Sequence, residues 1–271
     1  MSRSSKLTAY SLLLTAVYLA GCARFQIFPG KKAEVSLPGA AAIPVPENLK
    51  YRVYWWGIPV GLASLTAEAA KGPDSKEGDL RLLLEARSAW GLEAFYRVRV
   101  KLSSLYDPQA RAPRRFEASV KRRWRLHESQ ILFDSAKGEA FHQLPKNRSA
   151  RVKTGPATQD GLSLLYYVRG LPLQAGQEIP LQVAADGKNW DLKGKVRRIA
   201  QVKVGSLGKH TAVEGEAQLA YPVPFFHGAK ALVYFSAGGG RIPLLAKIHS
   251  RVGPVTVVLT EGSLGKETLL E

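Results

Sequence analysis

The stretch Phe95-Tyr-Arg-Val-Arg-Val-Lys-Leu102 decides the fold class, because apolar and basic side chains alternate in it from Tyr96 onward. Successive side chains of a β-strand point to opposite faces, so this alternation predicts a strand with one buried and one exposed face. Similar runs recur along the chain, separated by turn signals such as Asp107-Pro108 and Asp186-Gly187. The further strands are expected at residues 49–55, 61–69, 80–88, 115–126, 130–134, 179–183, 195–204, 231–235, 241–249 and 255–260.

One segment predicts a helix. Asp160 is a suitable N-cap, Leu165 and Tyr166 follow at helical spacing, and Gly170 and Pro172 end the segment. Many short strands with one helix, and no alternation of strands with helices, are typical of all-β domains. The sequence therefore predicts an all-β fold, a curved antiparallel sheet or open barrel with one short helix.

Composition narrows the class of protein further. The chain has 271 residues, of which 45% are hydrophobic and 23% charged, as expected for a globular domain with a sizeable core. A single cysteine excludes an internal disulfide and a cysteine-based zinc site. Lys and Arg number 39 against 22 Asp and Glu, a net charge of +17. That excess favours polyanionic partners such as anionic lipid headgroups, acidic polymers or nucleic acid.

The N-terminus predicts a cellular compartment. Arg3 and Lys6 precede an apolar run over residues 7–19, which is too short to span a bilayer with margin but fits a signal-peptide core. The following Leu19-Ala20-Gly21-Cys22 resembles a bacterial lipobox, which implies cleavage before Cys22 and attachment of diacylglycerol and an N-acyl chain such as palmitate. The alternative is an uncleaved anchor helix with an incidental cysteine.

This assignment divides the chain into three parts. Residues 1–21 are the expected lipoprotein signal peptide, residues 22–46 the acylated cysteine and a proline-rich tether, and residues 47–271 a single β-rich periplasmic domain. Ala23 rather than an aspartate follows the cysteine. By resemblance to the sorting rule of enteric bacteria, this favours the outer membrane, with the domain facing the periplasm.

Three stretches together resemble the domain of unknown function 3108, a family of Gram-negative envelope proteins. They are Tyr51-Arg-Val-Tyr-Trp-Trp-Gly-Ile-Pro-Val-Gly61, Asp160-Gly-Leu-Ser-Leu-Leu-Tyr-Tyr-Val-Arg169, and Val233-Tyr-Phe-Ser236 followed by Arg241-Ile-Pro243. The resemblance implies a periplasm-facing, β-rich domain and no particular reaction. The chain departs from the family pattern at residues 238–240, where three glycines stand in place of an expected acidic residue.

The densest positive charge lies between Arg97 and Arg125. Basic residues at alternate positions of antiparallel strands share a face, so a positive strip can form there. This strip is a candidate surface for phosphorylated lipid headgroups, lipopolysaccharide or peptidoglycan; the alternative is a solvated sheet face. Export as a lipoprotein argues against nucleic acid. The candidate residues are Arg97, Arg99, Lys101, Arg114, Arg115, Lys121, Arg122, Arg123 and Arg125.

Aromatic residues offer a second kind of site. Aromatic side chains at strand spacing ordinarily fill a barrel interior, but they can also line a cavity for an acyl chain. Trp55, Tyr96 and Tyr166 are the candidates for such an apolar lining.

Catalysis finds little support in the sequence. The five histidines are scattered, no phosphate-binding loop or nucleophile elbow occurs, and Asp160 with Ser163 fits a helix cap better than a catalytic pair. We therefore expect no cofactor, no metal and no enzyme. The expected function is that of a membrane-anchored lipoprotein that binds a lipid or an anionic envelope component. The alternatives are a structural protein that docks a protein partner or peptidoglycan and, third, a hydrolase.

Overall fold

The computed structural model describes residues 27–28, 42–93, 97–219, 229–250, 253–264 and 267–268. The expected signal peptide and Cys22 lie outside these residues. Within them, no helix is long and apolar enough to cross a membrane.

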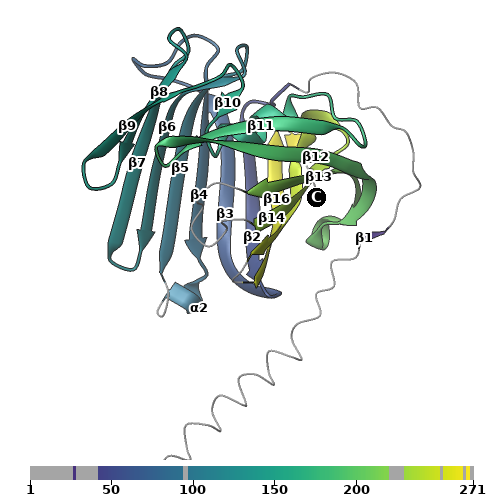
Figure 1. Ribbon diagram of the computed structural model, residues 1–271. Helices are drawn as coiled ribbons and strands as arrows, with labels where there is room; N and C mark the ends of the chain where they lie inside the picture. Colours follow the sequence, from purple (N-terminus) through teal and green to yellow (C-terminus); the bar gives the residue numbers. More distant parts are fainter. Residues whose placement is uncertain are drawn as a thin grey trace, which may run out of the picture.

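The described residues form one sheet of 17 strands, curved into an open barrel (Figure 1). The strands are β1 (Ile27–Phe28), β2 (Glu47–Trp55), β3 (Ile58–Ala69), β4 (Leu80–Ser88), β5 (Val98–Asp107), β6 (Ala112–Arg122), β7 (Arg125–Asp134), β8 (Glu139–Leu144), β9 (Arg148–Lys153), β10 (Thr158–Gln159), β11 (Glu178–Ala185), β12 (Lys188–Lys203), β13 (Lys209–Leu219), β14 (Ala229–Ser236), β15 (Pro243–Ser250), β16 (Gly253–Leu264) and β17 (Glu267–Thr268).

The connectivity is that of a meander whose two ends are joined. Consecutive strands pair antiparallel from β2 to β9 and from β11 to β16, and β16 then pairs with β2, so the last long strand lies beside the first. Only β10 and β11 pair in parallel among the described strands. The all-β prediction is confirmed.

The barrel stays open between β9 and the β11–β12 hairpin, where contacts rather than a strand ladder join the two halves. The Asn189 side-chain amide donates a hydrogen bond to the Lys153 carbonyl, and the Gly187 N–H donates to His142 Nδ1 at 3.2 Å. β1 pairs with β12 through Ile27 and Phe28, so two residues of the expected tether join the sheet.

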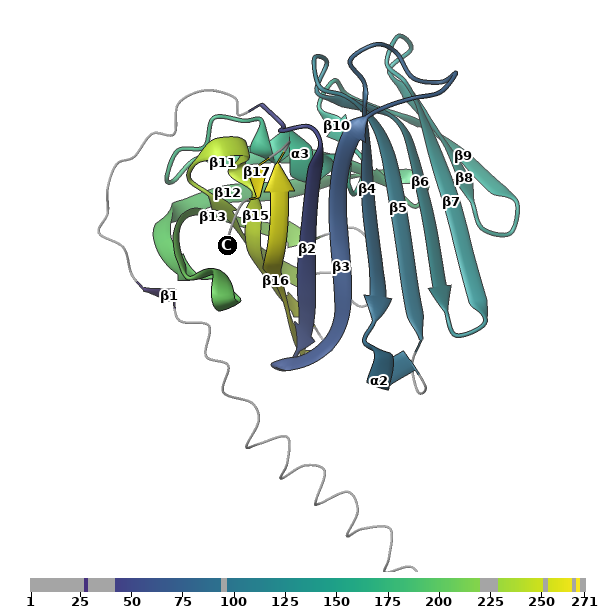
Figure 2. The ribbon, with the colours of Figure 1, turned by 180° about the vertical axis from the view of Figure 1, so that it is seen from behind.

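The predicted helix is α3, Ser163–Arg169. It lies at one end of the barrel, whereas the single helical turn α2, Trp90–Glu93, lies at the other end (Figure 2). Leu162 and Tyr166 pack into the larger apolar core with residues of β2–β5 and β14–β16, and Tyr167 and Val168 pack against the smaller core of β11–β13. The helix therefore fills the space between the two halves of the curved sheet.

Candidate functional site

A fully buried ion pair joins the start of β2 to the end of α3. The Arg169 guanidinium donates from Nη1 to Glu47 Oε1 at 2.9 Å and from Nη2 to Glu47 Oε2 at 2.5 Å. The Tyr166 hydroxyl donates to the same Glu47 Oε1 at 2.9 Å. Both carboxylate oxygens therefore have charged or hydroxyl donors, as a carboxylate removed from water requires.

The loop before β15 completes this buried polar cluster. Arg169 Nε donates to the Gly240 carbonyl at 3.0 Å, and Arg241 Nη1 donates to the Arg169 carbonyl at 3.0 Å. The Tyr51 hydroxyl donates to the Pro243 carbonyl at 2.9 Å. The three stretches quoted for the family resemblance thus meet at one place. Gly240, within the segment that lacks the expected acidic residue, contributes its carbonyl and has a positive φ of 70°.

The charges of this cluster stabilise one another. Burial would lower the pKa of Arg169, but the hydrogen bonds and charge of Glu47 raise it above its ordinary value. Burial, together with the negative charge of Glu47, raises the pKa of the Tyr166 hydroxyl. Arg169 is therefore a fixed cation and Tyr166 a fixed hydrogen-bond donor, and neither is poised to exchange a proton near neutral pH. The cluster is suited to holding the fold rather than to catalysis.

Asp160 and Ser163 cap α3 reciprocally. Asp160 Oδ1 accepts the N–H groups of Leu162 at 2.7 Å and Ser163 at 2.8 Å, and Ser163 Oγ accepts the Asp160 N–H at 2.9 Å. Ser104 Oγ on β5 donates to Asp160 Oδ2 at 2.7 Å. Burial raises the pKa of Asp160, against the opposing effect of these hydrogen bonds. The pair is a helix cap tied to the sheet.

The nine candidate basic residues fall into groups at different places along the strands. Arg114 and Arg115 lie near the start of β6, where acidic partners neutralise them. Arg114 bridges Asp79 at 3.1 Å and Asp107 at 2.5 Å, and Arg115 pairs with Asp74 at 2.9 Å. Lys101, midway along β5, lies 3.4 Å from Glu85. The structure therefore does not form one continuous strip from the nine residues.

The other six gather where β5 begins and the β6–β7 hairpin turns. Arg99 lies opposite Lys121 across β5 and β6, and Arg122 lies opposite Arg125 across β6 and β7. By strand alternation the two pairs face opposite sides of the sheet. Directly opposed like charges destabilise a sheet unless an anion lies between or beside them. The six residues are Arg97, Arg99, Lys121, Arg122, Arg123 and Arg125.

Arg87 extends this group and was missed by sequence reasoning. It is exposed on β4 directly opposite Arg99, so Arg87, Arg99 and Lys121 form a row of three cations on one face. The signal was present, because Arg81, Glu85 and Arg87 alternate with apolar residues in β4 as the basic residues do in β5. Among described residues, Arg87, Arg97, Arg99, Lys121 and Arg125 have no carboxylate within 4.0 Å.

The candidate apolar lining does not assemble. Tyr166 is fully buried beside Glu47 at the start of β2, whereas Trp55 is 44% exposed at the end of the same strand. The eight residue steps from Glu47 to Trp55 correspond to about 27 Å of extended chain. Tyr166 lies in a closed core and offers no surface to an acyl chain. Tyr96 lies outside the described residues.

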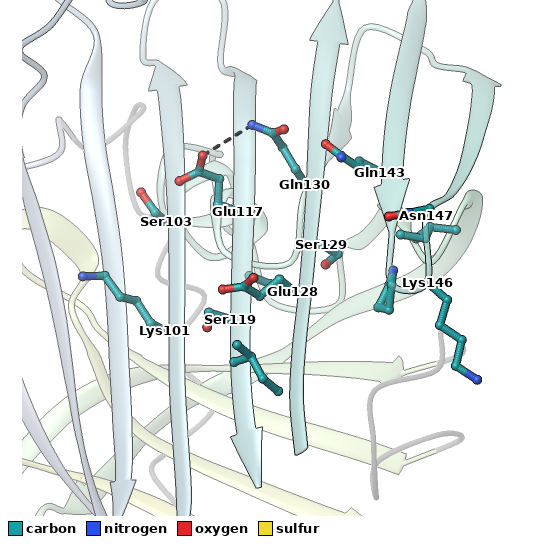
Figure 3. A pocket seen from close by; sticks show the side chains of 14 residues that line it. Lys101, Ser103, Glu117, Ser119, Glu128, Ser129, Gln130, Gln143, Lys146 and Asn147 are labelled. Atoms are coloured by element: carbon teal, nitrogen blue, oxygen red, sulfur yellow. Dashed lines mark hydrogen bonds between the residues drawn. The ribbon is translucent and has the colours of Figure 1, made fainter. Parts of the chain in front are cut away.

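A polar hollow of about 560 Å³ lies over β5–β8 and the β8–β9 turn (Figure 3). Hydroxyl and amide groups supply much of its lining, including Ser103, Ser119, Gln143 and Asn147. Lys101 and Lys146 lie at its two sides, with Glu117 and Glu128 between them. In the described part of the chain, no three His, Cys, Asp or Glu side chains are grouped as metal ligands.

Comparison with known proteins identifies a family and a fold. The model of the family described as "Protein of unknown function (DUF3108)" matches residues 50–260. A β-barrel-like protein of domain of unknown function DUF1849 from Brucella abortus is similar in structure, with a TM-score of 0.54 and 10% sequence identity. The similarity covers 83% of this chain and 100% of that one, and at this identity it shows the fold alone. No curated protein matches this chain.

Proposed function

We propose that this chain, which belongs to the DUF3108 family of proteins of unknown function, is a non-catalytic binding protein of the cell envelope. Its ligand on this proposal is an anionic envelope component carrying phosphate or carboxylate groups. An acyl anchor at Cys22 holds the domain at the periplasmic face of the outer membrane. The N-terminal sequence supports the anchor and the compartment.

One observation carries the proposed ligand class. The sheet end formed by residues 87–93, 97–99 and 121–128 holds seven basic residues against Glu93 and Glu128. On β12–β14, by contrast, Arg197, Arg198 and Lys230 pair with Glu214 and Glu216. Five of the seven, Arg87, Arg97, Arg99, Lys121 and Arg125, have no carboxylate within 4.0 Å among the described residues, and such cations on neighbouring strands raise the local concentration of anions. A multivalent anion satisfies charges that the protein itself does not.

The basic group can be tested with a soluble phosphate-rich probe. We expect calorimetry to detect binding of inositol hexakisphosphate. Its affinity should fall when the salt concentration rises from about 0.1 M to 1 M, because the screening length shrinks from about 10 Å to 3 Å. Replacing Arg122, Arg123 and Arg125 with serine should weaken binding by up to about 100-fold, at roughly 1 kcal/mol per charge.

The control removes two charges, by Lys71→Ser and Lys76→Ser, from the exposed β3–β4 loop at the other end of the sheet. This variant should bind the probe about as well as the unchanged protein. Binding that is indifferent to salt, or equally weakened by the control, would contradict the proposal. The anchor is tested separately by the mass of the N-terminal peptide, which should lose its acyl groups in Cys22→Ser.

The polar hollow supports a second candidate, binding of a cell-wall glycan. Serine hydroxyls and Gln and Asn amides match the hydroxyl-rich surface of a sugar chain. Soluble peptidoglycan fragments should then shift the amide resonances of β5–β8, and Gln143→Ala should weaken that binding without affecting the phosphate probe. Absence of shifts at β5–β8 would exclude this candidate.

A further inference from the structure

Four of the five tryptophans lie at one end of the sheet and are exposed. Trp55 and Trp56 are 44% and 61% exposed at the β2–β3 turn, Trp90 is 91% exposed between β4 and β5, and Trp124 is 83% exposed at the β6–β7 turn. Trp190 is half-buried on β12 and donates to the Ala185 carbonyl at 3.0 Å. Large exposed aromatic groups gathered at one place mark an interaction surface.

These three connections form one continuous edge, which we call the tryptophan rim. The Ala89 N–H donates to the Val60 carbonyl at 2.8 Å, and the Arg123 N–H donates to the Arg97 carbonyl at 2.8 Å. Hydrogen bonds thus link each connection to the next. The β2–β3 turn and α2 lie at the same end of the barrel, where β6 also ends (Figure 2). From the β2–β3 to the β6–β7 turn, four strand spacings give a rim about 19 Å long.

The rim is held in place rather than loose. The backbone N–H of Trp56 donates to the Pro254 carbonyl at 3.1 Å. The Trp56 indole lies against Gly253, where an added Cβ would come within 2.2 Å of Nε1. The Arg123 guanidinium lies 5.8 Å from the centre of the Trp124 ring. Trp56 and Arg123 also have positive φ values of 53° and 52°, a conformation that glycine ordinarily occupies.

Cations surround the rim on both faces of the sheet. Arg87, Arg99 and Lys121 lie on one face, and Arg122 and Arg125 lie on the other. The β2–β3 turn carries no charge from Val53 to Val60. Apolar tips flanked by cations match the layered chemistry of an anionic bilayer, in which acyl chains lie beneath negatively charged headgroups.

We propose that the tryptophan rim docks on the surface of an anionic phospholipid bilayer, with the indoles of Trp90 and Trp124 at the level of the headgroups. Indole rings favour this interface because they combine an apolar body with an N–H donor. The flanking arginines and lysine bind lipid phosphates. The domain then stands end-on to the membrane, with the buried polar cluster at its far end. This inference rests on the proposed function and names its ligand.

The test measures quenching of tryptophan fluorescence by lipids brominated on their acyl chains. The full chain is mixed with vesicles of phosphatidylcholine alone or of phosphatidylcholine with phosphatidylglycerol. Quenching reports only tryptophans at the bilayer, so it is informative whether the chain is anchored through Cys22 or binds from solution. We expect strong quenching and a blue-shifted emission with the anionic vesicles, and much weaker quenching with the zwitterionic ones.

Variants assign the effect to the rim. Trp90→Phe with Trp124→Phe should remove most of the quenching, whereas Trp190→Phe should leave it intact. Arg99→Ser with Lys121→Ser should lower quenching in anionic vesicles, and Lys71→Ser with Lys76→Ser, an equal change of charge at the other end, should not. Trp56 is left unchanged because its indole packs on Gly253.

The outcomes separate this inference from the proposed function. No quenching in anionic vesicles, while inositol hexakisphosphate still binds, would overturn membrane docking and leave anion binding standing. Equal quenching in both kinds of vesicle would overturn the role of the cations. If inositol hexakisphosphate does not bind and the anionic vesicles do not quench, both proposals are overturned.

Discussion

Removing either partner of the Glu47–Arg169 pair should be among the most destabilising single changes in the protein. In Glu47→Leu, Arg169 keeps the Gly240 carbonyl but loses the carboxylate acceptors of Nη1 and Nη2, and the Tyr166 hydroxyl loses the Glu47 acceptor. Each buried donor left unsatisfied costs about 1–3 kcal/mol, and breaking a buried ion pair costs about 3–5 kcal/mol. We expect a loss of about 4 kcal/mol, a large part of the 5–15 kcal/mol typical of folded proteins.

Urea unfolding followed by circular dichroism measures this loss. With an m value of about 3 kcal/mol per M, the midpoint should fall by roughly 1–2 M. The control is the double variant Glu47→Leu with Arg169→Met, which removes both charges. It should be more stable than either single variant, because no uncompensated charge remains buried. Losses that add in the double variant, or single variants that lose less than about 1 kcal/mol, would refute the idea that this pair is a buried, mutually dependent unit.

Three further predictions follow from local geometry. Burial lowers the pKa of His142, so its neutral form contributes stability above about pH 6.5 that is lost as the pH falls through the folded-state pKa. The midpoint of urea unfolding should therefore fall on acidification, and it should fall less in His142→Asn, which keeps an acceptor for the Gly187 N–H. Equal slopes of midpoint against pH in the two proteins would contradict this. Asp160→Ala removes the acceptor for two N–H groups of α3 and should cost about 2 kcal/mol in urea unfolding, with Asp160→Asn milder; an unchanged midpoint would argue against the cap. Arg123→Gly relieves a positive φ, so the free energy of unfolding should stay unchanged or rise by up to about 1 kcal/mol. The same change should weaken the binding of inositol hexakisphosphate. A destabilised variant would instead show that the Arg123 side chain holds the turn.

The alternation that predicted the sheet worked where one face of a strand is buried. β4 has the predicted bounds, and β2, β3, β11 and β14 differ from prediction by a few residues at their ends. β8, β9 and β13 were not predicted. In β13, Ala212, Val213 and Glu214 are buried in succession, so both faces are covered and the period of two disappears from the sequence.

The region 115–126 was predicted as one strand, and this was wrong. β6 ends at Arg122 and β7 begins at Arg125, with a tight turn at Arg123 and Trp124. Neither turn residue is glycine, asparagine, aspartate or proline, so no turn signal marks the reversal. Arg123 instead adopts the positive φ itself. The sequence thus located the basic residues correctly but could not show that a turn brings Trp124 to an exposed tip beside them.

The candidate site was predictable only in its local components. The helix cap at Asp160 follows from neighbouring residues, whereas the buried ion pair of Arg169 does not. Its partner, Glu47, is 122 positions away, and their contact depends on β16 returning to pair with β2 and on α3 entering the barrel. No periodicity within a segment records a contact of that range.

At one end of the barrel the charged groups are bound within the protein, whereas at the other end like charges face each other. This difference indicates which end binds a ligand. At the α3 end, Glu47, Arg169 and Arg241 are buried and their charged groups are bound by the protein itself, so an external ion gains little by approaching them. At the tryptophan rim, like charges face each other across β4, β5 and β6 with no described carboxylate between them. Such a row raises the free energy of the isolated domain, and an anion that binds there lowers it. A positive φ at Arg123 where glycine would be unstrained adds to this energy without adding to the core. The rim therefore combines features that lower the stability of the free protein, and binding of an anionic surface would offset them. The α3 end, in contrast, maintains the curvature of the sheet that presents the rim.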